Sequence, residues 1–476
     1  KKFTIINGIE LEIKQTKKKL FEIKKIKKIF HPVFLAIPIF LIFLFKRIKI
    51  FLMPIDKRSN SNENEILFIN YFMDPKINNT NFNSVYWGNL DHKMELNKIN
   101  RTWLHFYLPE SKLKYSRIKN FILTVNKNYK LNYFFLDKFF NFKTFLKIIF
   151  IWIKIVLSKK KIDKILDVKS ENNFLYFLFR DDFNENIFGY KFFYNSYYFF
   201  LFKNFFHKKR SFKKCFYLFE NQSWERSLQY NLNNKDQKKN KFGVVHSSIR
   251  FWDFRYFNME KLYQNFELKN FFHDSIIVSS EKFKKILKDN KFTNDKINLA
   301  ETLRYSNNIS TENKKLDFNN HKLKYIVVLG DYDFKINQKI EVFILSLAKK
   351  DDFKIIYKPH PLNDFNKTIF IKDKIIKSNE DIEVLSKKYE HFLVSNTSTV
   401  SLELFGTGKN IMTLLDDEFI NFSPLYHYYD YDNYVYEINQ IYENIKKYQR
   451  KSKNDKLFLL NKDLKSWIKY ININES

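Results

Sequence analysis

Apolar runs typical of β-strands alternate with segments of helical periodicity between residues 325 and 414, and this alternation constrains the fold more than any other feature. Strand and helix in turn give right-handed βαβ units, which form a parallel sheet with helices on its faces. We therefore expect a Rossmann-like domain that binds ligands at the carboxyl ends of its strands. The expected strands are 325–329, 353–357, 391–394 and 410–414, and the expected helices are 336–347, 381–389 and 398–405.

The N-terminal half carries a weaker form of the same pattern, with strand candidates at 66–72, 216–219, 242–245 and 275–278. A chain of 476 residues is too long for one ordinary hydrophobic core. We therefore expect an α/β protein with two Rossmann-like domains that face each other across a cleft. The predicted parts are an N-terminal extension at 1–57, a first domain at 58–310 with a mainly helical insertion at about 115–209, a second domain at 311–430, and C-terminal helices at 431–476 that pack back across the domains.

Two apolar segments raise the question of a membrane. The run 33–45 has 13 residues, fewer than the roughly 20 that span a bilayer, so an interfacial anchor and a buried helix both stay open. Segment 139–157 carries Lys143, Lys147 and Lys154 among apolar residues, which fits a helix lying against a membrane or against another helix. We expect a cytoplasmic protein, either free or peripheral on the cytoplasmic face of the inner membrane.

The composition excludes some classes of protein. The formal net charge of +32 would suit a nucleic-acid partner, but Lys is spread along every segment and no nucleic-acid motif accompanies it. We therefore expect no nucleic-acid partner, since anionic lipids or anionic sugar donors fit the same charge. The single cysteine, Cys215, excludes an internal disulfide and a Cys-based zinc site.

The sharpest local motif is the segment 357–361, Tyr-Lys-Pro-His-Pro, at the end of an expected strand. Proline fixes its own φ and keeps the preceding residue extended, so Lys358 and His360 should both be held at the carboxyl end of the strand, with Pro361 completing the motif. There a lysine could neutralise a phosphate, and a histidine could hydrogen-bond or protonate a departing nucleotide. A rigid strand exit with a solvated lysine is the alternative interpretation.

A cluster of hydroxyl groups opens the expected helix at 398–405. Ser395, Thr397, Ser398 and Thr399 lie where a strand ends and the helix begins, and Glu403 follows one turn later. Such residues often only cap a helix, but the exposed N–H groups there also attract anions. We expect this loop and the Lys-Pro-His-Pro loop to converge from neighbouring strands on one nucleotide and phosphate pocket, with Glu403 accepting ribose hydroxyls.

Gly330 and Asp331 follow the strand at 325–329. A glycine there permits either a close approach of the backbone to a ligand or a simple turn. Asp331 and Asp333 match an Asp-x-Asp pattern by letter, but we interpret the segment as a loop of the nucleotide domain. We expect no metal site and no cofactor.

Candidates for a catalytic base occur in the N-terminal half. A hydroxyl that attacks a sugar carbon must lose its proton, and Glu220, His246 or Asp253 could accept it because each follows an expected strand. The alternative interpretation places Glu225 and Arg226 on a solvated helix face.

The Lys-Pro-His-Pro and Ser/Thr segments resemble the HP and serine motifs of bacterial sialyltransferases and related capsule transferases, which have the GT-B fold and use CMP-activated sugars. The order from 66–68 and 86–88 through 220–225, 251–253 and 358–361 is similar to a bacterial family of surface carbohydrate (O-antigen) biosynthesis proteins. The resemblance implies that Lys358, His360 and the segment 395–399 contact the nucleotide and phosphate of the donor, and that an acidic residue of the first domain is the base.

We therefore expect a metal-independent glycosyltransferase whose partners are a nucleotide-sugar donor and a glycan or lipid-linked glycan acceptor. Transfer of a polyol phosphate is the nearest alternative activity, because transferases of that class have similar segments. A non-catalytic, membrane-associated scaffold of polysaccharide assembly is the alternative from a different class.

Overall fold

The computed structural model describes most of the chain between residues 32 and 472. The chain divides into two units, one formed by Lys1–Val244 and Leu262–Ser275 and the other by Val245–Lys261 and Ile276–Ser476. The description omits residues 1–31, 52–64, 73–75, 79–80, 85, 109–117, 122, 124–131, 171–173, 209–211, 234–239, 251–252, 257–259, 261–263, 266–267, 269–270, 293–295, 305–323, 351, 361–373, 416–419, 429–432, 449–456 and 473–476.

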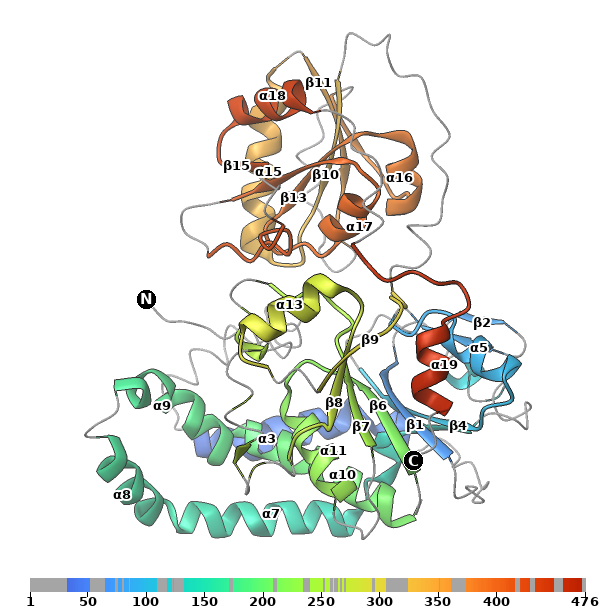
Figure 1. Ribbon diagram of the computed structural model, residues 1–476. Helices are drawn as coiled ribbons and strands as arrows, with labels where there is room; N and C mark the ends of the chain where they lie inside the picture. The colour runs from blue at the N-terminus through green and yellow to red at the C-terminus, as the bar shows by residue number, and fades with distance from the viewer. Residues whose placement is uncertain are drawn as a thin grey trace. The chain divides into compact units, whose positions relative to one another are not determined.

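The strands of the N-terminal half form a seven-stranded sheet in the order β5-β4-β1-β6-β7-β8-β9, with β2 and β3 as a separate hairpin (Figure 1). The pairs β1–β4, β1–β6, β4–β5, β6–β7 and β8–β9 are all parallel. The strands are β1 Glu65–Tyr71, β2 Lys76–Asn78, β3 Asn81–Asn83, β4 Arg101–Phe106, β5 Asn132–Phe135, β6 Phe212–Leu218, β7 Asn240–Val244, β8 Ser275–Val278 and β9 Ile297–Leu299.

The second sheet has six strands, all parallel, in the order β12-β11-β10-β13-β14-β15. By chain order this is 3-2-1-4-5-6, the doubly wound Rossmann arrangement. The predicted α/β chain with two Rossmann-like sheets is confirmed. How the two predicted domains face each other stays a prediction. The strands are β10 Lys324–Leu329, β11 Phe353–Lys358, β12 Ile375–Lys377, β13 His391–Ser395, β14 Asn410–Leu414 and β15 Tyr434–Val435.

The four strands expected between 325 and 414 all form, within one residue of their predicted ends. Strands β12 and β15 were not predicted, because three and two residues are too few to show a pattern. The helices of this part are α15 Phe334–Ala348, α16 Ile382–Lys388, α17 Val400–Gly406, α18 Ile438–Lys447 and α19 Lys465–Asn472. Helices α18 and α19 form within the predicted C-terminal helical stretch at 431–476, and residues 457–464 between them lie outside any helix.

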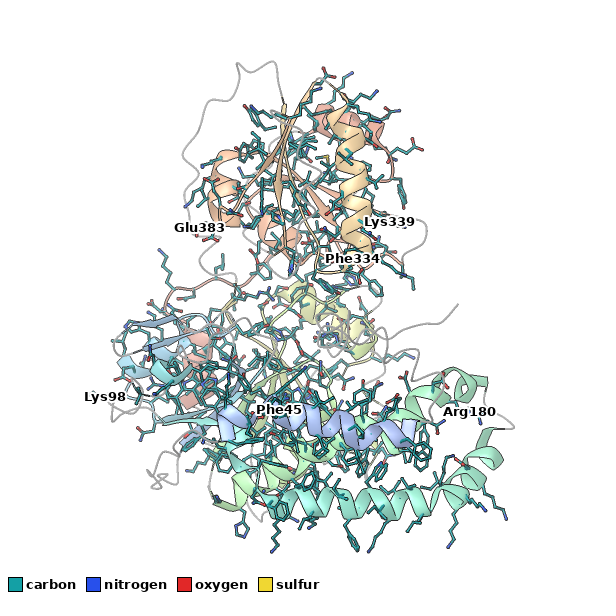
Figure 2. All side chains as sticks on the ribbon, turned by 180° about the vertical axis from the view of Figure 1, so that it is seen from behind. Phe45, Lys98, Arg180, Phe334, Lys339 and Glu383 are labelled. Atoms are coloured by element: carbon teal, nitrogen blue, oxygen red, sulfur yellow. The ribbon has the colours of Figure 1, made fainter. Side chains whose placement is uncertain are left out.

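One face of the six-stranded sheet is covered by α15 and α18, and Figure 1 shows α16 and α17 on the other side. Alternate strand residues such as Ile326 and Val328 point to the α15 side and are completely buried there with Ile340 and Ile344 of the helix. Each such side chain contributes about 1.5–3 kcal/mol by leaving water. In Figure 2 the labelled residues Phe334 and Lys339 mark α15.

The predicted insertion is mainly helical, but it also contains β5, which pairs with β4. This strand was not predicted, because it has only four residues, three of them aromatic, and the neighbouring helical segments have a similar composition. The helices of the first unit are α3 Pro32–Phe45, α4 Ile48–Phe51, α5 Leu90–Leu96, η1 Leu136–Phe139, α7 Phe142–Leu157, α8 Lys159–Ser170, α9 Phe174–Ile187, α10 Tyr190–Lys208 and α11 Ser223–Asn233; the short η2 Phe254–Tyr256 and α13 Glu281–Asp289 belong to the second unit.

Helix α3 covers the predicted apolar run 33–45. It packs against α10 through Phe40, whose ring stacks on Phe193. Just beyond it, the buried Arg47 guanidinium lies 3.1 Å from the Asp137 carboxylate, which also accepts a 2.7 Å hydrogen bond from Tyr197. One face of α3 is therefore buried, whereas Phe45 on its other face is exposed. Among the described residues no helix is both long and apolar enough to cross a bilayer.

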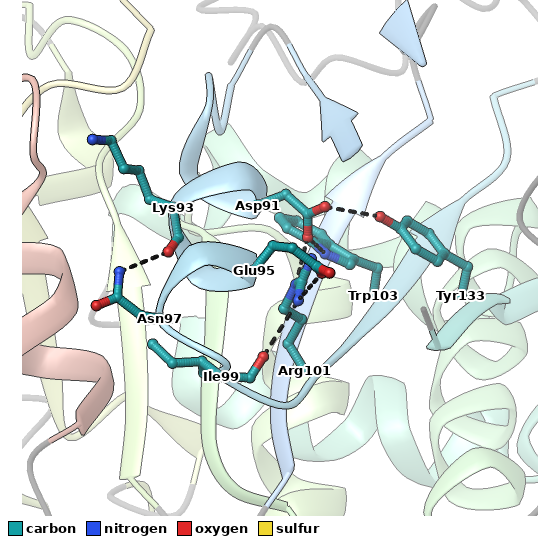
Figure 3. A network of polar contacts seen from close by, with 8 residues as sticks. All are labelled: Asp91, Lys93, Glu95, Asn97, Ile99, Arg101, Trp103 and Tyr133. Atoms are coloured by element: carbon teal, nitrogen blue, oxygen red, sulfur yellow. Dashed lines mark hydrogen bonds and ion pairs between the residues drawn. The ribbon is translucent and has the colours of Figure 1, made fainter. Parts of the chain in front are cut away.

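A buried polar network joins α5 to the seven-stranded sheet (Figure 3). The Asp91 carboxylate accepts hydrogen bonds from Arg101 Nε and Trp103 Nε1, both at 2.7 Å, and from Tyr133 Oη at 3.4 Å. The guanidinium of Arg101 also donates to Glu95 and to the Ile99 carbonyl. Every charge in this cluster has a partner, as burial requires.

Replacing Asp91 by Ala should lower the stability of the first unit by about 3–5 kcal/mol, because a buried guanidinium and an indole N–H lose their acceptor. Urea unfolding followed by circular dichroism measures the change. Asp182→Ala is the matched control, since the exposed pair of Asp182 with Lys191 should be worth about 1 kcal/mol or less. Equal losses in the two variants would contradict the assigned role of the network.

Candidate functional site

The strand order of the six-stranded sheet reverses between β10 and β13. Ligands of doubly wound sheets bind at such a switch point, where the loops after the two strands leave in opposite directions. Here those loops begin at Gly330 and at Asn396, and β11, on the far side of β10, ends in the Lys-Pro-His motif. The prediction that the two motif loops come from neighbouring strands is therefore wrong, because β10 lies between β11 and β13.

The Asp331 carboxylate connects the loops after β10 and β13. Its Oδ2 accepts a hydrogen bond from Ser395 Oγ and another, of 2.5 Å, from Thr397 Oγ1. Its Oδ1 accepts a 2.7 Å bond from the backbone N–H of Asp333. Asp331, Ser395 and Thr397 are all buried, so two of the predicted hydroxyl ligands are held by a carboxylate rather than exposed at a helix start.

Gly330 brings the third loop to the same place. Its backbone N–H donates to the Lys358 carbonyl at 2.8 Å. A Cβ on Gly330 would lie 2.7 Å from Tyr357 Oη and 3.0 Å from both Asn337 Oδ1 and the backbone nitrogen of His360. A side chain at this position would crowd these atoms, so close packing between the loops explains the glycine, and the approach of the backbone to a ligand stays a prediction.

His360 and Lys358 take different directions. The His360 ring lies 6.1 Å from the Tyr332 ring, edge to face. Burial lowers the pKa of His360 below its ordinary value of 6.5, and the charge of Asp331 partly opposes this, so the imidazole is neutral at neutral pH. A neutral imidazole hydrogen-bonds a phosphate and gains a proton only when an anion arrives. The Lys358 ammonium donates to the Glu380 carbonyl at 2.6 Å and keeps further donors.

The remaining predicted ligands of the Ser/Thr segment are less directly engaged. Helix α17 begins at Val400 rather than at Ser398, and Thr399 precedes it without a side-chain capping bond. The Ser398 backbone N–H donates to Ser395 O at 3.2 Å, and its carbonyl accepts from Ser401 Oγ. Glu403 is half-buried on α17. Pro361 lies outside the described residues.

Asp333, the second aspartate of the Asp-x-Asp pattern, has a structural role. It caps α15, since its Oδ1 accepts from the backbone N–H groups of Lys335 and Ile336. With Asp331 held by two hydroxyls, the segment is a loop, as interpreted from the sequence. Within the described part of the chain, no three His, Cys, Asp or Glu side chains are grouped as metal ligands.

Arg250 is a residue that the sequence analysis passed over. It lies in the segment Val245–Lys261 of the second unit and donates from Nη2 to the Thr397 carbonyl at 2.8 Å. Its Nε is buried without a hydrogen-bond partner among the described residues. Burial lowers its pKa, and electrostatic interactions with Tyr332, Asp253 and Asp331 partly oppose the shift. Arg250 thus adds a fixed positive charge near the Thr397 loop.

The seven-stranded sheet has its own switch point, between β1 and β6. Tyr71, the last residue of β1, donates from its hydroxyl to Glu220 Oε2 at 3.3 Å and accepts from Trp224 Nε1 at 3.0 Å. Gln222 Nε2 also donates to Glu220 Oε2 at 3.3 Å. Glu220 is half-buried, so its carboxylate is oriented and still reachable from solvent.

Glu225 is completely buried, so the alternative interpretation that placed it on a solvated helix face is wrong for this residue. Its Oε1 accepts from the backbone N–H groups of Glu220 and Gln222 at 2.8 and 2.9 Å, and this fixes a loop in which Asn221 has a positive φ of 57°. Burial raises the pKa of Glu225 to about 8, although the two hydrogen bonds oppose the shift. Glu225 is therefore mostly protonated at neutral pH and holds Glu220 in position.

The other two base candidates are less suited to accept a proton. Asp253 is buried in a two-pronged ion pair, with Arg255 Nε and Nη2 each 2.6 Å from one carboxylate oxygen. His246 follows β7 by two residues and is buried as well. Glu220 is the one of the three that is only partly buried.

No family model matches the chain, and no curated protein matches it. Solved structures do. A UDP-N-acetylglucosamine 2-epimerase from Rickettsia bellii has 11% identity and a TM-score of 0.45 over 86% of this chain and 98% of its own. TarM has 9% identity and a TM-score of 0.42 over 81% and 91%. CalG4, the calicheamicin glycosyltransferase, has 9% identity and a TM-score of 0.40 over 76% and 82%.

Gly330→Ala should lower the stability of the second unit by about 1–3 kcal/mol, because the new methyl group must displace Tyr357 or the backbone at His360. Thermal unfolding measures the loss. Gln338→Ala, at an exposed position of α15, should stay within about 0.5 kcal/mol of the parent. A Gly330→Ala protein as stable as this control would show that the loops do not pack as described.

Glu225→Gln should change how stability depends on pH. The folded-state pKa of about 8 lies above the ordinary 4.5, so the native state holds an extra proton between these values and the parent loses stability as pH rises through them. The variant lacks this group, so its stability relative to the parent should rise by a few kcal/mol from about pH 5 to about pH 8. Urea midpoints across this range measure the difference. The exposed Glu443→Gln serves as control, and parallel curves for Glu225→Gln and the parent would refute the raised pKa.

Proposed function

We propose that the chain is a glycosyltransferase that moves a sugar from a nucleotide-activated donor to a glycan acceptor. The proposal rests on one observation, the convergence of the loops after β10, β11 and β13 at the switch point of a parallel sheet. Doubly wound sheets bind nucleotides at this place. The three loops supply the closely packed Gly330, the neutral His360 and the Lys358 ammonium, and Arg250, from the segment Val245–Lys261, adds a second cationic side chain.

On this proposal the second unit holds the nucleotide. His360 donates a hydrogen bond to the donor phosphate, and Lys358 and Arg250 offset the negative charge that grows on the phosphate as the sugar leaves. Asp331, Ser395 and Thr397 are positioning residues, because their mutual hydrogen bonds keep the loops in place. The donor residues inferred from the sequence at Ser398, Thr399 and Glu403 stay proposals.

The first unit supplies the base. An acceptor hydroxyl attacks the anomeric carbon, and its proton passes to the Glu220 carboxylate as the new C–O bond forms. The bond between the anomeric carbon and the phosphate oxygen breaks, and the nucleotide leaves with that electron pair. Tyr71 and Gln222 orient the carboxylate, and the buried Glu225 fixes the backbone on which it is carried.

The finer proposal follows the motifs. The Lys-Pro-His-Pro and Ser/Thr segments support a CMP-linked acidic sugar as donor and a surface polysaccharide or lipid-linked glycan as acceptor. We propose that no divalent metal takes part, because Lys358 and Arg250 would supply the positive charge that a metal otherwise provides at the phosphate.

A thermal-shift screen with CMP, UDP, GDP, CDP and their sugar conjugates tests the proposal. One nucleotide should raise the melting temperature of the parent, since a ligand that binds only the folded state stabilises it, and the rise should persist in EDTA. His360→Ala should abolish most of the shift. The exposed His92→Ala should keep it, which separates loss of the site from loss of any histidine.

The outcomes separate the candidate activities. Stabilisation by CDP-ribitol or CDP-glycerol alone would indicate polyol-phosphate transfer instead. No stabilisation by any nucleotide would contradict the enzyme and favour the scaffold. Turnover of a nucleotide sugar without any acceptor would contradict sugar transfer. Full activity of the Glu220→Gln variant would contradict Glu220 as the base.

A further inference from the structure

Helix α7 has two apolar faces, although it lies on the surface of the first unit. One face packs inward: Trp152 donates from Nε1 to the Phe188 carbonyl at 2.9 Å, Thr144 accepts from Asn204, and Ile148 is completely buried. Figure 1 shows the helix at the margin of the unit, with α10 between it and the sheet. A surface helix packed in this way normally has polar residues outside.

The outer face of α7 is apolar as well. At about 100° per residue, five exposed side chains fall within an arc of about 80°. Phe142 is 72% exposed and Leu157 is 80% exposed, so the stripe is open at both ends. The stripe consists of Phe142, Leu146, Phe150, Ile153 and Leu157. An apolar patch this continuous marks a surface that is covered in use.

Lysines border the stripe on one side. Lys143, Lys147 and Lys154 are exposed and occupy the next arc of about 40°, and α7 contains no acidic residue. The Lys154 ammonium lies 4.4 Å from the centre of the Phe150 ring, so its stem lies along the stripe. Lys159, Lys160 and Lys161 follow at the start of α8.

We propose that the outer face of α7 binds the surface of a bilayer that contains anionic lipids, with the stripe among the acyl chains and the lysines at the headgroups. The proposal stands apart from the catalytic role. Lysines beside an apolar arc on a helix parallel to the surface are the arrangement that anionic membranes select. A second copy of the chain is a poor occupant, because a two-fold contact of α7 with itself would bring its lysines together without any acidic partner.

Flotation of the full chain with vesicles tests the proposal. The parent should bind vesicles that contain phosphatidylcholine and phosphatidylglycerol. It should bind more weakly to vesicles of phosphatidylcholine alone, and more weakly to the mixed vesicles at high salt. Combining Phe142→Ser, Leu146→Ser and Phe150→Ser should weaken binding about tenfold or more. Combining Lys143→Gln, Lys147→Gln and Lys154→Gln should weaken it about tenfold on anionic vesicles only.

The matched control combines Phe334→Ser and Val342→Ser, two exposed apolar residues of α15 in the other unit, and should bind vesicles like the parent. Failure of the parent to bind, or equal binding by the triple-serine variant, would overturn the proposal. So would a lipid-free dimer, seen by sedimentation velocity, that the serine substitutions convert to a monomer. A lower melting temperature in the triple-serine variant would show that the chain itself covers the face, and would overturn it too.

Discussion

The reversal of strand order in each parallel sheet is the constraint on which both candidate sites depend. In a right-handed doubly wound sheet the connections of the two halves run over opposite faces of the sheet. The loops after the two central strands therefore diverge, and the carboxyl ends of these strands are open to a ligand. In one sheet these ends are Tyr71 and Glu220, and in the other they are Gly330 and Ser395. Polar residues that lie far apart along the chain are thus brought together by the strand order.

At the second switch point, the Asp331 carboxylate holds the loops after β10 and β13 together. Two buried hydroxyls and a backbone N–H donate to it, so the carboxylate is held inside the unit. Its negative charge still acts on His360, where it opposes the lowering of the pKa by burial. Gly330 at the same place lets the His360 backbone lie so close that a Cβ on residue 330 would be 3.0 Å from the His360 nitrogen. The loops are fixed by contacts inside the unit, and the proposed contacts to the phosphate come from His360, Lys358 and Arg250.

Much of the second unit could be predicted, because its buried strands are apolar runs broken by helices with clear periodicity. The strands β12 and β15 could not, since so few residues carry no pattern. The position of β10 between the two motif loops was also beyond reach, because spacing along the chain does not give strand order. Glu225 and Arg250 were missed for a related reason: a charged residue at a helix start or in a loop suggests solvent, and only tertiary packing buries it.

Segment 139–157 shows a limit of a different kind. Its sequence left a membrane contact and a helix contact as alternatives, but the helical wheel accommodates both on separate arcs. Thr144, Ile148 and Trp152 use the inner arc, and the side chains from Phe142 to Leu157 lie outside with the lysines at their edge. An apolar period of 3.6 residues indicates one buried face, whereas a helix apolar over most of its circumference needs two partners. The structure supplies the first partner, and the lysine border defines the chemistry of the second.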